Sequence, residues 1–192
     1  MKICIIRHGE TDWNVIGRLQ GREDIPLNEN GMTQAKNCGL ALESNVWTAV
    51  VTSTLSRAKQ TAEIIANVLN ISQFHDDVDL VECDYGKASG LTADERAVKF
   101  PDGKYEGHEG WEPLRDRVCG ALTKWAEKFY PNNIIIVSHG GAINAILAEL
   151  SNREIGSGKT RLKNACINMF AYKGGHFSIE YYNKSYDEIG TL

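Results

Sequence analysis

The clearest pattern in the chain is a pair of short apolar runs that end in the same way. Residues 3–6 read Ile-Cys-Ile-Ile, and residues 134–137 read Ile-Ile-Ile-Val. Runs of apolar, mostly branched residues predict strands buried on both faces, as in parallel sheets. A histidine followed by a glycine comes just after each run, at His8 and at His139. Ligands bind at the carboxyl ends of parallel strands, so neighbouring strands here would turn two imidazoles toward one site.

Segments with apolar residues at helical spacing separate the predicted strands. The clearest is 112–129, where Leu114, Val118 and Phe129 fall on one stripe. This alternation predicts an α/β fold with three α/β/α layers, a mostly parallel central sheet and a single domain over residues 1–192. The other predicted elements are a turn at 28–31, helices at 32–43, 56–69 (capped by Ser56) and 142–150, a short helix capped by Thr92, strands at 49–51 and 78–81, a hairpin of 166–172 and 177–182, and a loose tail over the last ten residues.

Charge and hydropathy restrict the class of partner. The 192 residues carry a formal net charge of −4 and no long basic block, which argues against a nucleic-acid or anionic-membrane surface. The apolar run before Arg7 is only four residues long, too short for a signal peptide. No apolar stretch approaches the ~18 residues of a membrane span. We therefore expect no nucleic-acid partner and no membrane partner.

The cysteines indicate the compartment. The chain has five of them, an odd number, widely spaced and without a CxxC pair. Several fall at predicted core positions. This usage is typical of free thiols in a reducing cytosol, and it predicts a cytoplasmic protein.

Side chains of complementary chemistry follow the predicted strands. Arginine guanidiniums hold tetrahedral oxyanions in a forked geometry, so two of them at one edge of the sheet predict a phosphate ligand. The edge would also carry two imidazoles and one carboxylate. The residues that we expect to meet there are Arg7, His8, Arg57, Glu82 and His139.

A nucleotide cofactor and a metal ion both fit the sequence poorly. There is no Walker glycine loop and no GxGxxG motif. The histidines lack HxH or HExxH spacing, and two neighbouring arginines would repel a divalent cation. We therefore expect no cofactor and no metal.

Histidine can instead act as a nucleophile toward phosphorus. Such a transfer requires positive charge on the phosphoryl oxygens and an acid for the leaving oxygen, and the predicted set contains both. Two alternatives stay open at this point. Glu82 could simply pair with an arginine, and the protein could bind a phosphate ligand without turning it over.

Several motifs resemble one known family over essentially the whole chain. They are RHGE at 7–10 followed by TDWN, LQG at 19–21, TSTLSRAKQTA at 52–62, LVECDYGKASGLT at 80–92 and SHGG at 138–141. Together they are similar to the histidine phosphatase superfamily, also called the phosphoglycerate mutase-like family. The resemblance implies that family's fold and a metal-independent phosphatase acting through phosphohistidine.

The resemblance also implies a role for each matching residue. His8 would be the phosphorylated nucleophile. Arg7, Arg57 and His139 would hold the phosphoryl group. Glu82 would protonate the leaving group and later act as the base for water. Further hydrogen bonds to the phosphate or substrate would come from Asn14, Gln20, Gly21 and Gly140.

The chain departs from the family pattern at three places. Ser53-Thr54-Leu55 stands where members usually show Ser-Pro-Leu. Ala88-Ser89 stands where many phosphatases carry Trp-Glu, which predicts a wider or more polar entrance. His108-Glu109-Gly110 replaces a Gly-Glu-Ser element, so Glu109 is a second acidic candidate for the pocket. The far end of the pocket is expected to be built from loops 84–92 and 101–111.

The substrate is less specified than the chemistry. We expect a small-molecule phosphate ester and a broad range of substrates. The alternatives are a cofactor-dependent phosphoglycerate mutase and a phosphatase dedicated to alpha-ribazole phosphate or phosphoserine. The compact segment between Glu82 and the helix at 112–129 favours hydrolysis over mutase activity. A homodimer is compatible with the sequence.

Overall fold

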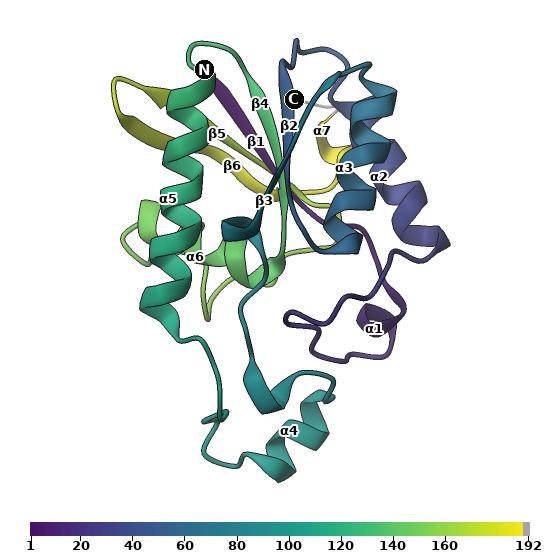
Figure 1. Ribbon diagram of the computed structural model, residues 1–192, viewed down its shortest axis with the longest axis vertical. Helices are drawn as coiled ribbons and strands as arrows, with labels where there is room; N and C mark the ends of the chain where they lie inside the picture. Colours follow the sequence, from purple (N-terminus) through teal and green to yellow (C-terminus); the bar gives the residue numbers. More distant parts are fainter. Residues whose placement is uncertain (190–192) are drawn as a thin grey trace.

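The computed structural model, described here for residues 1–189, is built around a six-stranded sheet in the order β3-β2-β4-β1-β5-β6. Figure 1 shows this sheet between two groups of helices. The four strands β3, β2, β4 and β1 are parallel to one another, and β5 pairs antiparallel with β1 on one side and with β6 on the other. The prediction of a mostly parallel sheet is confirmed. The strands are β1 (Lys2–Arg7), β2 (Ala49–Ser53), β3 (Gln73–Asp77), β4 (Ile134–Ser138), β5 (Ile167–Lys173) and β6 (His176–Lys184).

Helices cover both faces of the sheet, which confirms the three-layer prediction. Ile3 and Ile5 of β1 belong to the core beneath α5 and α6, while Cys4 and Ile6 belong to the core beneath α2 and α3. This division follows from the alternation of side chains along a strand. The helices are α1 (Asp12–Val15), α2 (Glu29–Ala41), α3 (Ser56–Val68), α4 (Ala93–Lys99), α5 (Trp111–Phe129), α6 (Gly140–Leu150) and α7 (Tyr186–Ile189), with 3₁₀ turns η1 (Val78–Leu80) and η2 (Gly86–Ala88).

The two predicted apolar strands are neighbours. β1 pairs with β4 in parallel register, with Arg7 opposite Ser138. The His8 N–H extends this ladder by donating to the Ser138 carbonyl at 2.9 Å. The two His-Gly turns therefore leave the sheet at the same edge, as predicted.

The third strand lies earlier in the chain than predicted. Residues 73–77 form β3, and residues 78–80 form the turn η1. The strand reads Gln-Phe-His-Asp-Asp and lies at the edge of the sheet, so it needs little apolar character. Asp77 ends it by accepting a hydrogen bond from the Asp79 N–H at 3.0 Å. Glu82 consequently follows a turn rather than a strand.

Two predicted helix starts need correction. The predicted turn at 28–31 is the first turn of α2, where Asn28 caps the helix by accepting from the Gly31 N–H at 2.8 Å. Asparagine is favoured both in turns and at the N-cap of helices, so the sequence pattern is ambiguous. Ser56 is the first residue of α3 rather than its cap. The capping hydrogen bond comes from a distant loop, in which the Asp24 carboxylate accepts from the Ser56 N–H at 2.7 Å.

The C-terminal segment is more ordered than the predicted loose tail. β6 continues to Lys184, and α7 follows it. Tyr186 and Ile189 are partly buried against the core beneath α2 and α3. The end of the predicted tail, residues 190–192, lies outside the described residues.

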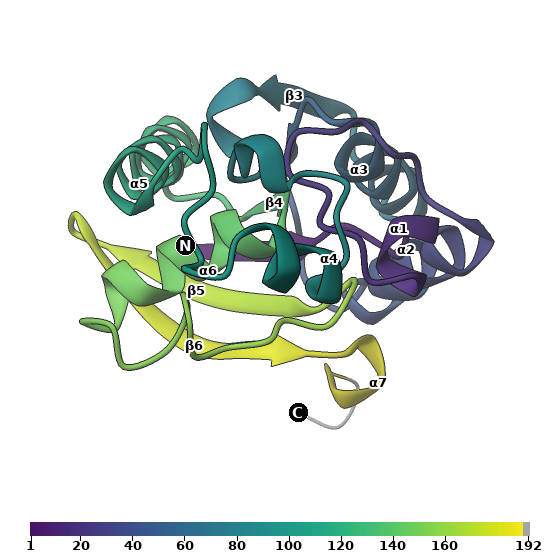
Figure 2. The same ribbon diagram turned by 90° about the horizontal axis from the view of Figure 1, so that it is seen from below.

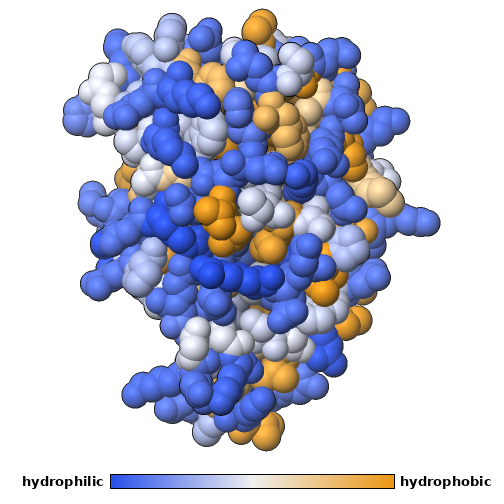
Figure 3. Space-filling model, in the orientation of Figure 1, coloured by the Kyte–Doolittle hydropathy of each residue, from blue (hydrophilic) through white to orange (hydrophobic). Residues whose placement is uncertain are grey.

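The surface and the cysteines agree with the composition. On the face shown in Figure 3, apolar side chains form small groups separated by hydrophilic ones. Within residues 1–189, no helix combines the length and the apolar character that crossing a membrane requires. All five cysteines are free, and four of them are buried.

Candidate active site

A polar cavity of about 550 Å³ lies at the carboxyl edge of the parallel strands. Six of its lining side chains are cationic, and one, Glu82, is a carboxylate. His139 lies beneath the cavity, with its ring centroid 5.2 Å from that of His8. The predicted residues that line the cavity are Arg7, His8, Asn14, Gln20, Gly21, Arg57, Glu82 and Gly140.

The turn that presents His8 is fixed by a close approach of two backbone segments. A Cβ at Gly9 would lie 2.4 Å from the Gly31 carbonyl oxygen, so only glycine fits there. The Gly9 N–H donates to Thr61 Oγ1 at 3.0 Å, and this hydroxyl donates to the Arg57 carbonyl at 2.7 Å. The turn that carries His8 is therefore tied to the first turn of α3, which carries Arg57.

His8 is held as a neutral base. Its Nδ1 lies 2.7 Å from the Gly9 carbonyl oxygen, which can only accept, so Nδ1 carries the proton and Nε2 keeps its lone pair. Burial lowers the pKa of His8 well below its usual value, and the charges of Arg7 and Arg57 lower it further. A neutral imidazole with a free Nε2 has the protonation state that a nucleophile requires.

We expect the His8 imidazole to remain neutral, with the proton on Nδ1, at about pH 6, where an ordinary histidine is largely charged. Its folded-state pKa is lowered, so below the unfolded pKa the unfolded chain binds a proton that the folded chain rejects. Acidification through this range therefore lowers the free energy of unfolding. Imidazole ¹⁵N chemical shifts of the free protein would check this. Two protonated ring nitrogens at this pH would contradict it.

The two arginines leave one buried donor each toward a ligand. Arg57 is fully buried, and its Nη1 and Nη2 donate to the Glu23 and Gly21 carbonyls at 2.7 and 2.8 Å. Arg7 Nη1 donates to the Leu162 carbonyl at 2.6 Å. The Nε of each guanidinium is buried and has no protein partner. A buried N–H without a partner is costly, and an anion in the cavity would supply the acceptor.

The guanidiniums keep their charge. Burial lowers the pKa of Arg57 to about 10, which still leaves it protonated near neutral pH. Gly140 lies beside Arg7, since a Cβ there would be 3.4 Å from Arg7 Nε, an ordinary van der Waals distance. The predicted Gly140 therefore lines the cavity next to this guanidinium.

His139 is fully buried below the cavity. Its Nε2 lies 2.7 Å from the Ser53 hydroxyl, and its Nδ1 has no protein partner. Burial lowers the pKa of His139 well below its usual value, with Arg57 and His8 as further causes. Ser53 is a residue that the sequence reasoning did not identify, although it begins the Ser-Thr-Leu departure.

Glu82 is fixed by backbone groups rather than by an arginine. Its Oε1 accepts from the Cys83 and Ala142 N–H groups at 2.8 and 3.0 Å, and its Oε2 accepts from the Gly141 N–H at 3.0 Å. Two of these donors belong to the first turn of α6, where the helix dipole favours a negative charge. A Cβ at Gly141 would lie 2.5 Å from Oε1, so the carboxylate needs this glycine. Within residues 1–189 no arginine lies within ion-pair distance of the Glu82 carboxylate, so the alternative of a simple arginine ion pair is not observed there.

Asn14 and Gln20 both face the cavity. Asn14 forms a capping box with Thr11 at α1 and accepts from Asn164 Nδ2 at 3.0 Å. It therefore stabilises the start of α1 and also forms part of the pocket wall. Gln20 is buried, and its Oε1 has no protein partner. Gly21 has a φ of +55° and contributes its carbonyl to Arg57.

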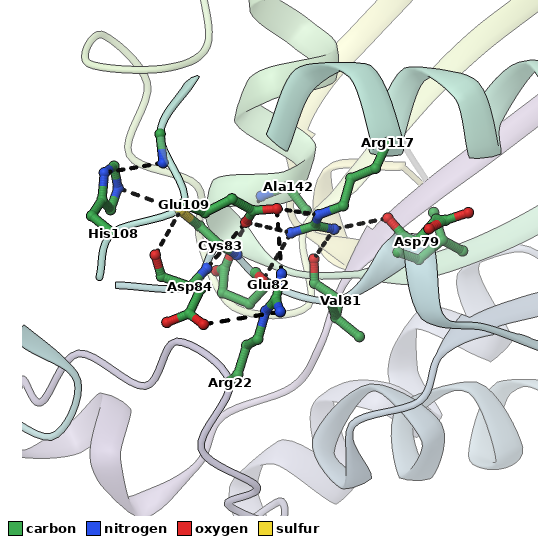
Figure 4. Close-up of polar contacts among 12 residues, drawn as sticks. Arg22, Asp79, Val81, Glu82, Cys83, Asp84, His108, Glu109, Arg117 and Ala142 are labelled. Carbon is green, nitrogen blue, oxygen red and sulfur yellow. Dashed lines mark hydrogen bonds and ion pairs between the residues drawn. The ribbon is translucent and has the colours of Figure 1, made fainter. Parts of the chain in front are cut away.

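Glu109 does not line the cavity, and the prediction that it lies in the pocket is wrong. Figure 4 shows its carboxylate against Arg117, with Nε–Oε1 and Nη2–Oε2 distances of 2.6 and 2.9 Å. Arg22 approaches from the other side at 3.3 Å. Burial alone would raise the pKa of Glu109, but the hydrogen bonds from Arg117 and from the Asp84 N–H lower it. The carboxylate is neutralised by its neighbours and turned away from the site.

Arg117 fastens the segment that carries Glu82. Its Nη1 donates to the Asp79 and Val81 carbonyls at 2.8 and 2.7 Å, and its Nη2 donates to the Glu82 carbonyl at 2.9 Å (Figure 4). These bonds tie residues 79–82, which have no strand partner, to α5.

We expect Arg117→Met to lower the free energy of unfolding by about 3 kcal/mol, because it leaves the Glu109 carboxylate and three carbonyls without their partner. Arg115→Met is the matched control on the same helix, since Arg115 bonds the exposed Asp116. Urea unfolding of the two variants would measure the difference. Equal stability of both variants would contradict this account of Arg117.

The outer wall of the cavity differs from the prediction. Ala88 is fully buried and does not line it, so the departure at 88–89 does not widen the entrance. Loop 84–92 contributes Tyr85, and loop 101–111 contributes to a neighbouring cavity of about 280 Å³ instead. The wall that the sequence reasoning missed includes Arg18, Arg96, Asn144 and the loop at 160–164.

The sheet and its loops bring His8, two arginines and a carboxylate to the lining of one polar cavity, with the His139 ring 5.2 Å from that of His8, and this set of side chains is typical of the class of phosphoryl-transfer enzymes. A family model confirms this class, and the chain belongs to the histidine phosphatase superfamily (branch 1), whose model matches residues 3–185. This family comprises the phosphoglycerate mutase-like enzymes of the predicted resemblance. The prediction of an enzyme that hydrolyses phosphate esters is confirmed.

Relatives carry names of both phosphatases and mutases. The chain is 42% identical to the "Uncharacterized phosphatase PhoE" of Bacillus subtilis (strain 168), over 94% of this chain and 93% of the relative. It is 34% identical to the "Metal-independent phosphoserine phosphatase" of Arabidopsis thaliana (88% and 75%). It is 30% identical to the "Probable phosphoglycerate mutase GpmB" of Salmonella choleraesuis (strain SC-B67) (90% and 86%). Among solved structures, Bacillus stearothermophilus YhfR matches with a TM-score of 0.87 and 26% identity, covering 94% of this chain and 95% of that chain.

Proposed function

We propose that the protein is a metal-independent phosphatase that hydrolyses small-molecule phosphomonoesters through a phosphohistidine on His8. The observation that carries this proposal is the neutral His8 imidazole, which lies beside two arginines with unpartnered Nε groups in a polar cavity. The substrate phosphate would accept from these Nε groups and so lie against His8 Nε2.

The first half-reaction forms a phosphorus–nitrogen bond and breaks the ester bond. His8 Nε2 attacks phosphorus, and the electron pair of the ester bond goes to the leaving oxygen. Protonated Glu82 gives its proton to that oxygen, which leaves as an alcohol. Arg7 and Arg57 stabilise the charge on the equatorial oxygens. Further hydrogen bonds to the phosphoryl group would come from His139, Asn14, Gln20, the Gly21 turn and the segment at Gly140.

The second half-reaction returns the enzyme to its starting state. The Glu82 carboxylate takes a proton from water, and the oxygen attacks phosphorus. The phosphorus–nitrogen bond breaks with its electron pair returning to His8 Nε2, and inorganic phosphate leaves. The three backbone N–H groups that hold Glu82 would keep one carboxyl group in position for both proton transfers.

The test of the class is hydrolysis of an aryl phosphate in the presence of EDTA. We expect turnover without added metal. A strict requirement for a divalent ion would overturn the proposal. Tight binding of phosphate without any turnover would favour the alternative of a binding protein.

A mutase is the second candidate, favoured by the relative named a probable phosphoglycerate mutase. A mutase must protect its phosphoenzyme from water, and here the chain between Glu82 and α5 is short. We therefore expect release of inorganic phosphate from 3-phosphoglycerate. Efficient conversion to 2-phosphoglycerate with little hydrolysis, on addition of bisphosphoglycerate, would overturn the hydrolase proposal.

We expect Glu82→Gln to lower kcat/KM about a hundredfold for alkyl phosphates and much less for an aryl phosphate. An alkoxide leaves poorly without a proton, whereas an activated phenolate does not need one. Steady-state kinetics on a matched alkyl and aryl pair would measure the difference. Equal losses on both substrates would remove Glu82 from the role of general acid.

We also propose that residues 1–192 act as one domain in the cytoplasm. The five free cysteines support this location, since a reducing compartment would keep them so.

A further inference from the structure

The outer wall of the cavity carries more positive charge than a phosphomonoester requires. Beyond Arg7 and Arg57, four further cationic side chains line it, in a chain whose formal net charge is −4. They come from two sides of the opening. Arg18 follows α1 and Arg96 lies in α4, at the end of the molecule that faces the viewer in Figure 2. Arg161 and Lys163 come from the loop before β5.

These four side chains differ in whether they form hydrogen bonds or ion pairs within the protein. Arg18 donates to the Gly90 carbonyl and pairs with Glu95 at 3.5 Å. Arg96 donates to the Leu91 carbonyl at 2.9 Å. Lys163 pairs with Glu188 at 2.9 Å.

Arg161 is the side chain without such a partner. It is exposed, and within residues 1–189 no carboxylate lies within ion-pair distance of its guanidinium. It also lines the same cavity as Arg7. Burial is the largest cause that lowers the pKa of Arg7, and the charge of Arg161 lowers it further. A guanidinium without a carboxylate partner that lines the same cavity as Arg7 adds repulsion between like charges, which an anion bound between them would relieve.

We propose that Arg161, together with Lys163, forms a second anion-binding subsite that selects phosphomonoesters bearing a further acidic group. This rests on the proposed phosphatase function and names the class of its substrate. The phosphate ester would occupy the base of the cavity at His8, and the second acidic group would extend to the 160–164 loop. A carboxylate and a second phosphate share the chemistry that a guanidinium recognises, so both belong to the class.

Three matched substrates test the subsite: glycerol 3-phosphate, 3-phosphoglycerate, in which a carboxylate replaces the hydroxymethyl group, and glycerol 1,3-bisphosphate. We expect kcat/KM for at least one of the two acidic substrates to exceed that for glycerol 3-phosphate about tenfold, with a preference that weakens as salt is raised. The acidic substrate that is preferred identifies the group that the subsite takes.

Variants at Arg161 test whether this residue causes the preference for acidic substrates. We expect Arg161→Gln to remove most of it, Arg161→Glu to reverse it, and Arg161→Lys to retain part of it, because lysine keeps the charge but not the fork. Lys173→Gln is the control for net charge, since Lys173 is exposed on the β5–β6 hairpin outside the cavity. A preference that survives Arg161→Gln, or a loss shared equally by all three substrates, would overturn the proposal.

Binding to the His8→Ala protein separates this proposal from the proposed function. Calorimetric titration with the three ligands needs no turnover. Tighter binding of an acidic ligand that depends on Arg161 would support the subsite even if the wild-type protein hydrolysed none of them. Equal affinities for the three ligands, in a protein that hydrolyses aryl phosphates, would contradict the subsite and leave the phosphatase function standing.

Discussion

His8→Ala is expected to lower kcat for phosphomonoester hydrolysis by more than about a thousandfold, because it removes the group that accepts the phosphoryl. The effect should be on kcat for every substrate, with phosphate binding largely retained, since Arg7 and Arg57 remain. Steady-state kinetics and phosphate titration of the same variant would measure both quantities.

The control for this variant is His176→Ala. His176 is exposed at the start of β6 and does not line the cavity, so its removal should leave kcat unchanged. Near-normal turnover by folded His8→Ala protein would contradict the assignment of the nucleophile.

Arg57→Ala is expected to lower kcat/KM by about a thousandfold, the size of effect seen when a guanidinium is removed from a transferring phosphoryl group. The side chain also holds the Gly21 and Glu23 carbonyls, so the loop over the site loses two fixed contacts. Arg57→Lys restores the charge but not the fork, and it should recover only part of the activity. Kinetics with an aryl phosphate would give these ratios.

Lys59→Ala is the matched control in the same helix. Lys59 pairs with Asp76 at 2.7 Å on the surface, and its loss should change kcat/KM by less than about twofold. Thermal unfolding of both variants separates a catalytic loss from a folding defect. Full activity of folded Arg57→Ala protein would contradict the role of this arginine.

The strands that build the site could be predicted because their sequence has one interpretation. Four apolar residues followed closely by a His-Gly pair predict a buried strand and a binding edge, and this holds for β1 and β4. β3 was misplaced because its polar edge sequence carries no such signal, while the apolar residues after it form a turn. Asp77 ends the strand and starts the turn through a capping hydrogen bond, which the apolar periodicity of the sequence does not reveal.

The phosphoryl end of the cavity was also predictable, since its residues lie next to the strand ends. The assignment of Glu109 failed because its charge is neutralised by Arg117, which sequence reasoning did not identify as its partner. The prediction of the outer wall of the cavity failed for a related reason. Residues 160–164 have no regular structure and follow the last long helix, so only the folded chain shows that they face Arg18 and Arg96.

The most direct test of the account is to trap the phosphoenzyme. Rapid quenching of the wild-type protein during turnover of a ³²P-labelled phosphomonoester should give protein-bound phosphate that is labile in acid and stable in base, and peptide mapping should place it on His8. Glu82→Gln protein should accumulate more of it, since water then lacks its base. Labelled phosphate on another residue, or turnover with no bound phosphate at any time, would contradict the mechanism.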